Sequence, residues 1–168
     1  NTTFSSIPLP LKNKIGVDPS DGGTHRMTSD EFFSKNEKKF NVIFIDGLHI
    51  YEQCQKDCIN SLKFIEENGI ILFHDLLPQN YLQEKVPRKS ASWTGDVWKV
   101  AVELANSEDM DFKIANIDYG VGILKPGKNA KYKKIPDLNN MNFDDFLKKF
   151  YNNLPTINSE EAIKFIEK

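Results

Sequence analysis

The chain has 168 residues, of which 39% are hydrophobic and 27% are charged. This is the size and composition of one globular domain with a sizeable core, and it excludes a disordered chain. The net charge of −2 argues against wholesale binding to nucleic acid or to an anionic membrane, because both need a basic face. No apolar stretch approaches the roughly 20 residues that span a bilayer, and no signal-peptide pattern is visible.

The first predicted strand is Lys14–Asp18 (KIGVD), and a turn-rich SDGG follows it. The segment Thr28–Glu31 (TSDE) has the form of a capping box, in which side chains satisfy the free amides at a helix start. We therefore expect a helix that begins at about Ser29 and carries Phe32 and Phe33 inward.

The clearest predicted strand is Phe40–Asp46, whose run of consecutive apolar residues is typical of a sheet covered on both faces. An amphipathic helix over Ile50–Asn68 follows, because apolar residues recur there at spacings of three and four. The next residue is a glycine, which we expect to end the helix. Ile70–Phe73 is the second buried strand, and His74 and Asp75 come directly after it.

The two cysteines, Cys54 and Cys58, fall on one face of this predicted helix. Helix geometry disfavours a disulfide between them, and the chain has no further cysteine to complete a metal site. We interpret them as packing residues of a protein in a reducing compartment, which predicts a cytoplasmic location.

A long polar segment, Leu76–Thr94, exceeds the usual length of a connection and is typical of a lid or binding loop. Helical spacing returns over Gly95–Asn106. Two short strands, Phe112–Ile117 and Val121–Leu124, flank a turn and predict a hairpin. Two more helices follow, and a capping box at Asn158 starts the last one.

Strands that alternate with helices through short loops predict a Rossmann-like, doubly wound α/β fold with a mostly parallel sheet and an antiparallel C-terminal hairpin. We expect this domain over residues 1–128, with residues 129–168 as a helical extension packed on it. Ligands of such sheets bind beyond the carboxyl ends of the strands. The residues that fall at these ends are Asp18, Asp46, His49, His74 and Asp75.

Each of these residues also has an ordinary interpretation. An aspartate after a strand often caps a helix or forms an Asx-turn. A histidine at a strand end is often no more than a hydrogen-bonded structural residue, and we expect this of His25. The coincidence of several acids and imidazoles at one rim is what favours a functional site there.

Several segments resemble class I S-adenosylmethionine-dependent methyltransferases, in particular the branch with an IDG-x-H-x-Y-E … HD pattern, which is similar to sugar and macrolide O-methyltransferases. The segments are IGVDPS, TSDEFF, FNVIFIDGLHIYEQ, NGIILFHDLLP, GDVWK and DYGVGIL, and they cover about residues 14–125. The chain departs from the pattern at Asn68, where a glycine is common, and at Leu48, where an aspartate is common.

The resemblance implies a binding site for S-adenosylmethionine. In this site Asp18 would bind the ribose hydroxyls, and Ser29 and Asp30 would lie near the adenine. Asp46 and Gly47 would lie near the methionine part of the cofactor.

The resemblance also implies catalytic roles for His49, His74 and Asp75. His74 and Asp75 would face the acceptor, and either histidine would serve as the base, since neutral imidazole with a pKa of about 6.5 suits this role. Similar sugar O-methyltransferases hold Mg²⁺ at two strand ends, so Asp46 and Asp75 are candidate metal ligands. The expected reaction is O-methylation of a small hydroxyl compound such as a sugar, by a monomer or a homodimer.

Members of this family build the cofactor site first on a strand and loop of the form Glu-x-Gly-x-x-x-Gly, and no such motif occurs before Lys14. We therefore expect the chain to start just after this motif, without the first family strand, and to bind S-adenosylmethionine weakly or not at all. Either the Ile15–Asp18 strand would then close onto Phe40–Asp46, or another chain would fill the gap.

Two other functions stay open from the sequence. Without the glycine-rich motif, the chain would be a non-catalytic, methyltransferase-like binding or scaffold domain. The His74-Asp75 pair also resembles that of metal-dependent HD phosphohydrolases, although those enzymes carry the pair on helices. The basic residues within Lys85–Lys89 would either contact an anionic acceptor or lie in solvent.

Overall fold

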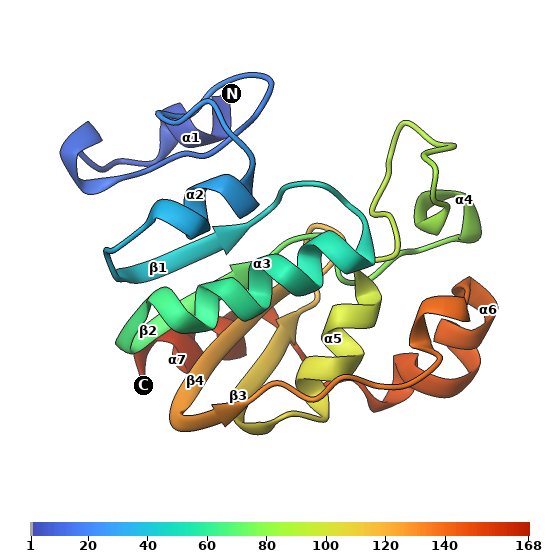
Figure 1. Ribbon diagram of the computed structural model, residues 1–168. Helices are drawn as coiled ribbons and strands as arrows, with labels where there is room; N and C mark the ends of the chain where they lie inside the picture. Colours follow the sequence, from blue (N-terminus) through green and yellow to red (C-terminus); the bar gives the residue numbers. More distant parts are fainter. Residues whose placement is uncertain (1) are drawn as a thin grey trace. The chain divides into compact units, whose positions relative to one another are not determined.

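The computed structural model describes residues 2–168, with side chains from Phe4 onward (Figure 1). The chain divides into two compact units, which meet in sequence between Lys38 and Lys39. None of the helices formed by the described residues has the length and apolar character that a bilayer crossing requires.

The first unit contains α1 (Thr2–Ser6), a 3₁₀ turn over Leu11–Asn13 and α2 (Ser29–Lys35). Helix α2 begins where the capping box predicts. The Thr28 hydroxyl accepts a hydrogen bond from the Glu31 amide, and the Glu31 carboxylate accepts one from the Thr28 amide.

The predicted strand over Lys14–Asp18 is reduced to a single parallel bridge between Val17 and His25. The amides of Thr24 and His25 both donate to the Gly16 carbonyl, so the loop that follows satisfies the backbone of this segment locally. The segment is not one of the five strands of the sheet, and the expected closure onto Phe40–Asp46 does not form.

Residues 39–168 form a five-stranded sheet of order β1-β2-β4-β3-β5. Strands β1 and β2 are parallel, β4 is antiparallel to both β2 and β3, and β5 is parallel to β3. All strands except β4 therefore run in one direction, which confirms the predicted mostly parallel α/β sheet with an antiparallel hairpin. The strands are β1 (Phe40–Ile45), β2 (Ile65–Phe73), β3 (Glu108–Ala115), β4 (Val121–Lys131) and β5 (Thr156–Ile157).

Helices cover both faces of this sheet (Figure 1). Helices α3 (Tyr51–Phe64) and α5 (Trp98–Ala105) lie on one face, and α7 (Ser159–Glu167) lies on the other. The residues between β4 and β5 include α6 (Phe143–Asp145), followed by a π-helical turn over Phe146–Phe150.

Successive side chains of β2 point to opposite faces of the sheet, which explains why helices pack on both faces. Ile71 and Phe73 point into the large core that α3 and α5 share with the sheet. Ile70 and Leu72 point the other way and pack with Ala162 of α7 in a smaller cluster. This period of two is what a strand imposes on an apolar run, and it requires helices on both sides.

The predicted helix over Ile50–Asn68 is longer than the observed one, because α3 ends at Phe64 and Ile65 already pairs with Phe40 of β1. The residues before Gly69 form an irregularity within β2, between the Phe40–Ile65 pair and the next pair of the ladder. Asn68 has a φ of 65° there. The Asn-Gly pair therefore makes a bulge in a strand and does not end a helix.

The two cysteines are free and buried in the core on α3, which agrees with their interpretation as packing residues. Desolvation by this burial raises the pKa of both thiols above the ordinary value. Both thiols are therefore neutral packing groups.

A buried carboxylate ties α3 to α5. Glu103 of α5 is fully buried and accepts hydrogen bonds from the Tyr51 hydroxyl at 2.8 Å, the Gln55 amide at 2.7 Å and the Tyr132 hydroxyl at 2.6 Å. The backbone amide of Ile135 also donates to it. Because a buried polar group is tolerated only when it is hydrogen-bonded, this network fixes the N-terminal part of α3 against α5.

Candidate functional site

Four of the side chains that the sequence placed at the carboxyl ends of the strands come together in the second unit. Asp46 directly follows β1, and His74 and Asp75 directly follow β2. His49 lies in the short connection between β1 and α3. One ligand atom each from Asp46, His74 and Asp75 falls within 4.8 Å of the others.

Asp75 stands at the centre of this cluster. Its Oδ2 lies 3.2 Å from Nδ1 of His49 and 3.2 Å from Nδ1 of His74. The Asp75 side chain is only 8% exposed. Its φ of 64° is in the left-handed region, which aspartate and asparagine tolerate better than most residues. One buried carboxylate therefore orients two imidazoles.

His74 has a carboxylate at each ring nitrogen. Besides the Asp75 contact at Nδ1, its Nε2 lies 3.0 Å from Oδ2 of Asp118. These partners, Asp75 first and then Asp118, raise the pKa of His74 from 6.5 to about 9, against the opposing effect of burial. His74 therefore carries a proton at neutral pH.

His49 is held differently. Its Nδ1 faces two acceptors, the Trp93 carbonyl at 2.7 Å and the Asp75 carboxylate at 3.2 Å, so this nitrogen carries a proton. Its Nε2 lies 3.6 Å from Asp46 Oδ1. The pKa of His49 is raised, first by Asp46 and also by the Trp93 carbonyl and Asp75. In the neutral ring the lone pair is on Nε2.

Asp46 is the most open carboxylate of the Asp46–His74–Asp75 group, with 37% of its side chain exposed. The contact of its Oδ1 with His49 lowers its pKa most, and the charge of His74 adds to this effect against burial. Asp46 is therefore an ionised group that a ligand can reach.

Asp118 and Trp93 contact the cluster although the sequence analysis did not select them. Asp118 lies in the turn after β3, and β3 runs parallel to β1 and β2, so its carboxyl end reaches the same rim. The position and direction of β3 in the sheet would have indicated that Asp118 lies at this rim. Trp93 comes from the long polar segment, where no periodicity points to a particular residue.

Three predicted site residues come from the other compact unit of the chain. Asp18, Ser29 and Asp30 belong to the first unit. Oδ1 of Asp18 accepts the amides of Ser20 and Asp21 at 2.7 Å each, which is the ordinary Asx-turn interpretation. These backbone bonds lower the pKa of Asp18.

Gly47 and Gly95 border the cluster and differ in what a side chain would meet. At Gly47 an added Cβ would meet no atom within 4 Å. Gly95 has a φ of 62°, and an added Cβ would overlap the carbonyl oxygen of His49. Close approach of two backbones thus requires glycine at Gly95 but not at Gly47.

We expect Gly95→Ala to lower the free energy of unfolding by about 2–4 kcal/mol, because alanine is strained at this φ and its Cβ overlaps His49. Gly47→Ala is the matched control, with an expected change within about 0.5 kcal/mol. Urea denaturation followed by circular dichroism measures both. Equal losses in the two variants would contradict the packing described here.

The raised pKa of His74 predicts how stability depends on pH in chelator-treated protein. The folded chain holds this proton more tightly than the unfolded chain, so the stabilisation is complete below about pH 6.5 and is lost as the pH rises through about 9. We therefore expect the melting temperature to fall over this range, and His74→Gln to flatten the fall. An identical slope in His74→Gln would contradict the assignment.

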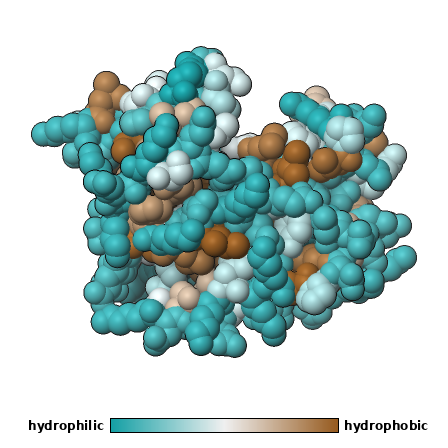
Figure 2. Space-filling view, in the orientation of Figure 1, coloured by the Kyte–Doolittle hydropathy of each residue, from teal (hydrophilic) through white to brown (hydrophobic). Residues whose placement is uncertain are grey.

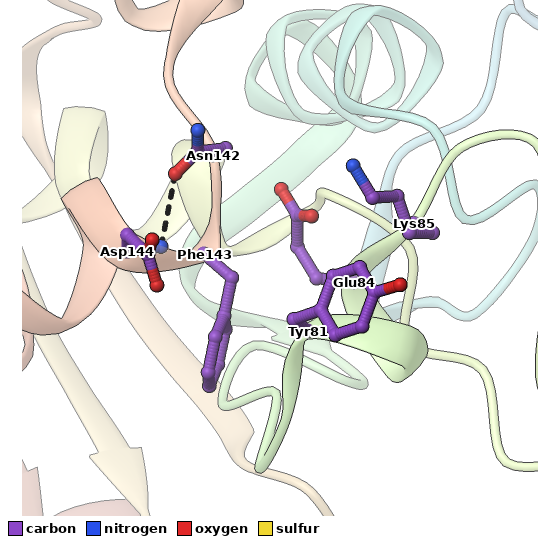
Figure 3. A pocket seen from close by; sticks show the side chains of 6 residues that line it. All are labelled: Tyr81, Glu84, Lys85, Asn142, Phe143 and Asp144. Carbon is purple, nitrogen blue, oxygen red and sulfur yellow. Dashed lines mark hydrogen bonds between the residues drawn. The ribbon is translucent and has the colours of Figure 1, made fainter.

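A separate cavity of about 470 Å³ lies between α4 (Tyr81–Glu84) and α6 (Figure 3). Figure 3 shows side chains from the two helices on opposite sides of the gap. The residues that line it are Tyr81, Glu84, Lys85, Asn142, Phe143 and Asp144. None of the residues that line this cavity belongs to the cluster of carboxylates and imidazoles.

The outer surface gives little further indication of a binding face. Figure 2 shows a largely hydrophilic face on which apolar residues appear in scattered groups. Exposed apolar side chains near the cavity include Tyr81, Leu82 and Val86. Scattered apolar residues of this kind are normal on a folded protein.

Comparison with known proteins bears on the same region. Residues 20–76 match a family model described as a methyltransferase domain. The matched segment is about a third of the chain, and it contains Asp46, His49, His74 and Asp75. A comparison with curated proteins finds no matching sequence. The match and the Rossmann-like sheet together support a methyltransferase domain in general terms.

Proposed function

We propose that the protein is an S-adenosylmethionine-dependent methyltransferase that methylates a hydroxyl group of a small compound such as a sugar. The cluster formed by Asp46, His49, His74 and Asp75 carries this proposal. It lies at the carboxyl ends of two adjacent parallel strands, where ligands of such sheets bind, and within the segment that matches a methyltransferase domain.

His49 is the proposed base. Its Nδ1 proton is engaged by Trp93 and Asp75, which leaves Nε2 to accept the proton of the acceptor hydroxyl. The Asp75 carboxylate then stabilises the positive charge that forms on the ring. S-adenosylmethionine, when bound, would supply the electrophilic methyl group, with Asp46 and Gly47 as candidate contacts.

His74 has a different proposed role. With a pKa of about 9 it is already protonated at neutral pH and is a poor base. Its contacts to Asp75 and Asp118 hold the central carboxylate in place. Of the two histidines that the sequence left as alternatives, the geometry favours His49.

Asp46, Asp75 and His74 would also fit a divalent cation, because two carboxylates and one imidazole can reach a common point. His74 would release its proton on binding the cation, because a ligand imidazole is neutral. The two carboxylates suit Mg²⁺ and Mn²⁺. A cation bound there would supply positive charge that lowers the pKa of the acceptor hydroxyl.

We expect Asp46→Asn to weaken Mn²⁺ binding by about tenfold or more, because it removes the charge of the most open carboxylate of the set. Electron paramagnetic resonance of free Mn²⁺ measures the affinity. Glu67→Gln is the control, since Glu67 is an exposed acid on β2 that pairs with Lys128 away from the cluster. An affinity that Asp46→Asn leaves unchanged would remove Asp46 from the metal ligands.

The proposed function is tested by following a tritium-labelled methyl group from S-adenosylmethionine into a panel of sugars and other hydroxyl compounds. The donor is supplied at millimolar concentration, so that transfer from a weakly bound donor is also detected. We expect label in at least one acceptor, and no label with His49→Gln. Absence of transfer to every acceptor would favour the non-catalytic binding domain instead.

The hydrolase alternative finds no support in the geometry. His74 and Asp75 directly follow strand β2 and do not lie on a helix. This differs from the HD phosphohydrolases that the pair resembles.

A further inference from the structure

Trp93 contacts His49 in two independent ways. The indole stacks on the imidazole, with ring centroids 5.2 Å apart and planes inclined by 21°. The backbone carbonyl of Trp93 lies 2.7 Å from His49 Nδ1, the nitrogen that carries the proton. One residue of the long polar segment therefore covers a face of this ring and fixes its donor nitrogen.

Trp93 is itself held by the segment that precedes it. Its Nε1 donates to the Lys85 carbonyl at 2.7 Å. The Arg88 guanidinium lies 5.8 Å from the indole centre, and Arg88 also donates to the carbonyls of Ser90 and Ala91. Residues 85–93 are thus folded around the indole, with a cation against the same ring that stacks on His49.

The backbone after Trp93 is fixed as well. The amides of Thr94 and Gly95 both donate to the Gln83 carbonyl, at 3.1 Å and 3.0 Å. Gly95 lies against the carbonyl of His49, where no side chain fits. The Trp93 carbonyl is therefore anchored from both directions along the chain.

We propose that Trp93 is a positioning residue, which holds the His49 ring so that Nε2 is the nitrogen presented to the acceptor. The proposal rests on the proposed function of His49 as the base. With Nδ1 bonded to the Trp93 carbonyl and to Asp75, a flip of the imidazole would lose both acceptors. Orientation of this kind matters because a displacement of about 1 Å at a reacting group costs about a hundredfold in rate.

The test is the rate at which diethyl pyrocarbonate modifies each histidine, followed by peptide mass spectrometry. His25, in the first unit and outside the cluster, serves as the internal reference for His49. We expect Trp93→Ala to raise the modification rate of His49 by about fivefold or more, because the ring loses the indole that covers it, and the segment that carries the residue-93 carbonyl loses the indole's bond to Lys85. Trp93→Phe keeps a stacking ring and is expected to stay within about twofold of the original protein.

An unchanged His49 rate in Trp93→Ala, or an equal rise in Trp93→Phe, would overturn the proposal. If Trp93→Ala shows no melting transition, Trp93→Leu takes its place with the same expectations. The measurement needs neither donor nor acceptor. A failure to detect methyl transfer would therefore count against the proposed function, and the modification rates would still decide the role of Trp93.

Discussion

Asp75→Asn is expected to lower the turnover rate of methyl transfer by about 10²–10⁴-fold, and to lower the melting temperature as well, because His74 loses the partner that raises its pKa most. The Asp75 carboxylate accepts from two imidazoles at once and stabilises charge on His49. An amide keeps the shape but loses this charge, and its nitrogen cannot accept a hydrogen bond. Asparagine also tolerates the φ of 64° at this position, so the backbone is preserved.

The matched control for this variant is Asp118→Asn. Asp118 contacts His74 from an exposed turn, with 70% of its side chain accessible, and it has no described contact with His49. We expect this change to cost less than about tenfold in turnover, because exposed ion pairs contribute little. Turnover of Asp75→Asn at or above that of Asp118→Asn would contradict the central position given to Asp75.

His49→Gln is expected to lower turnover by about 10²–10⁴-fold and to leave the Michaelis constant for the acceptor nearly unchanged. Glutamine retains a side-chain amide near the Trp93 carbonyl but cannot take up a proton. The comparison is with His74→Gln, which removes a histidine that is already protonated at neutral pH. A larger loss of turnover in His74→Gln than in His49→Gln would reverse the roles given to the two residues.

The sequence was most informative where one strong local signal acts alone. The apolar run at Phe40–Ile45 formed strand β1, and the capping boxes at Thr28 and Asn158 started helices α2 and α7. Parallel strands must end at a common edge, so the meeting of Asp46 with His74 and Asp75 followed from the parallel sheet that the sequence predicted.

The sequence was least informative where contacts between residues far apart in the chain determine the local structure. Helical spacing continued past Phe64, yet Ile65 joined β2 because pairing with Phe40 completes the sheet. The Lys14–Asp18 run has strand composition but found one bridge partner only, His25. Trp93 lies in a segment without periodicity, and its position depends on contacts with Lys85, Arg88 and His49 that no local pattern encodes.

The central claim is that donor and acceptor meet at the rim formed by the ends of β1 and β2. Titration of ¹⁵N-labelled protein with millimolar S-adenosylhomocysteine, followed by amide chemical shifts, tests it even for a weakly bound ligand. We predict that the largest shifts fall on residues 46–49 and 74–75. Shifts confined to the opposite ends of these strands, or no shift at the rim at saturating ligand, would contradict it.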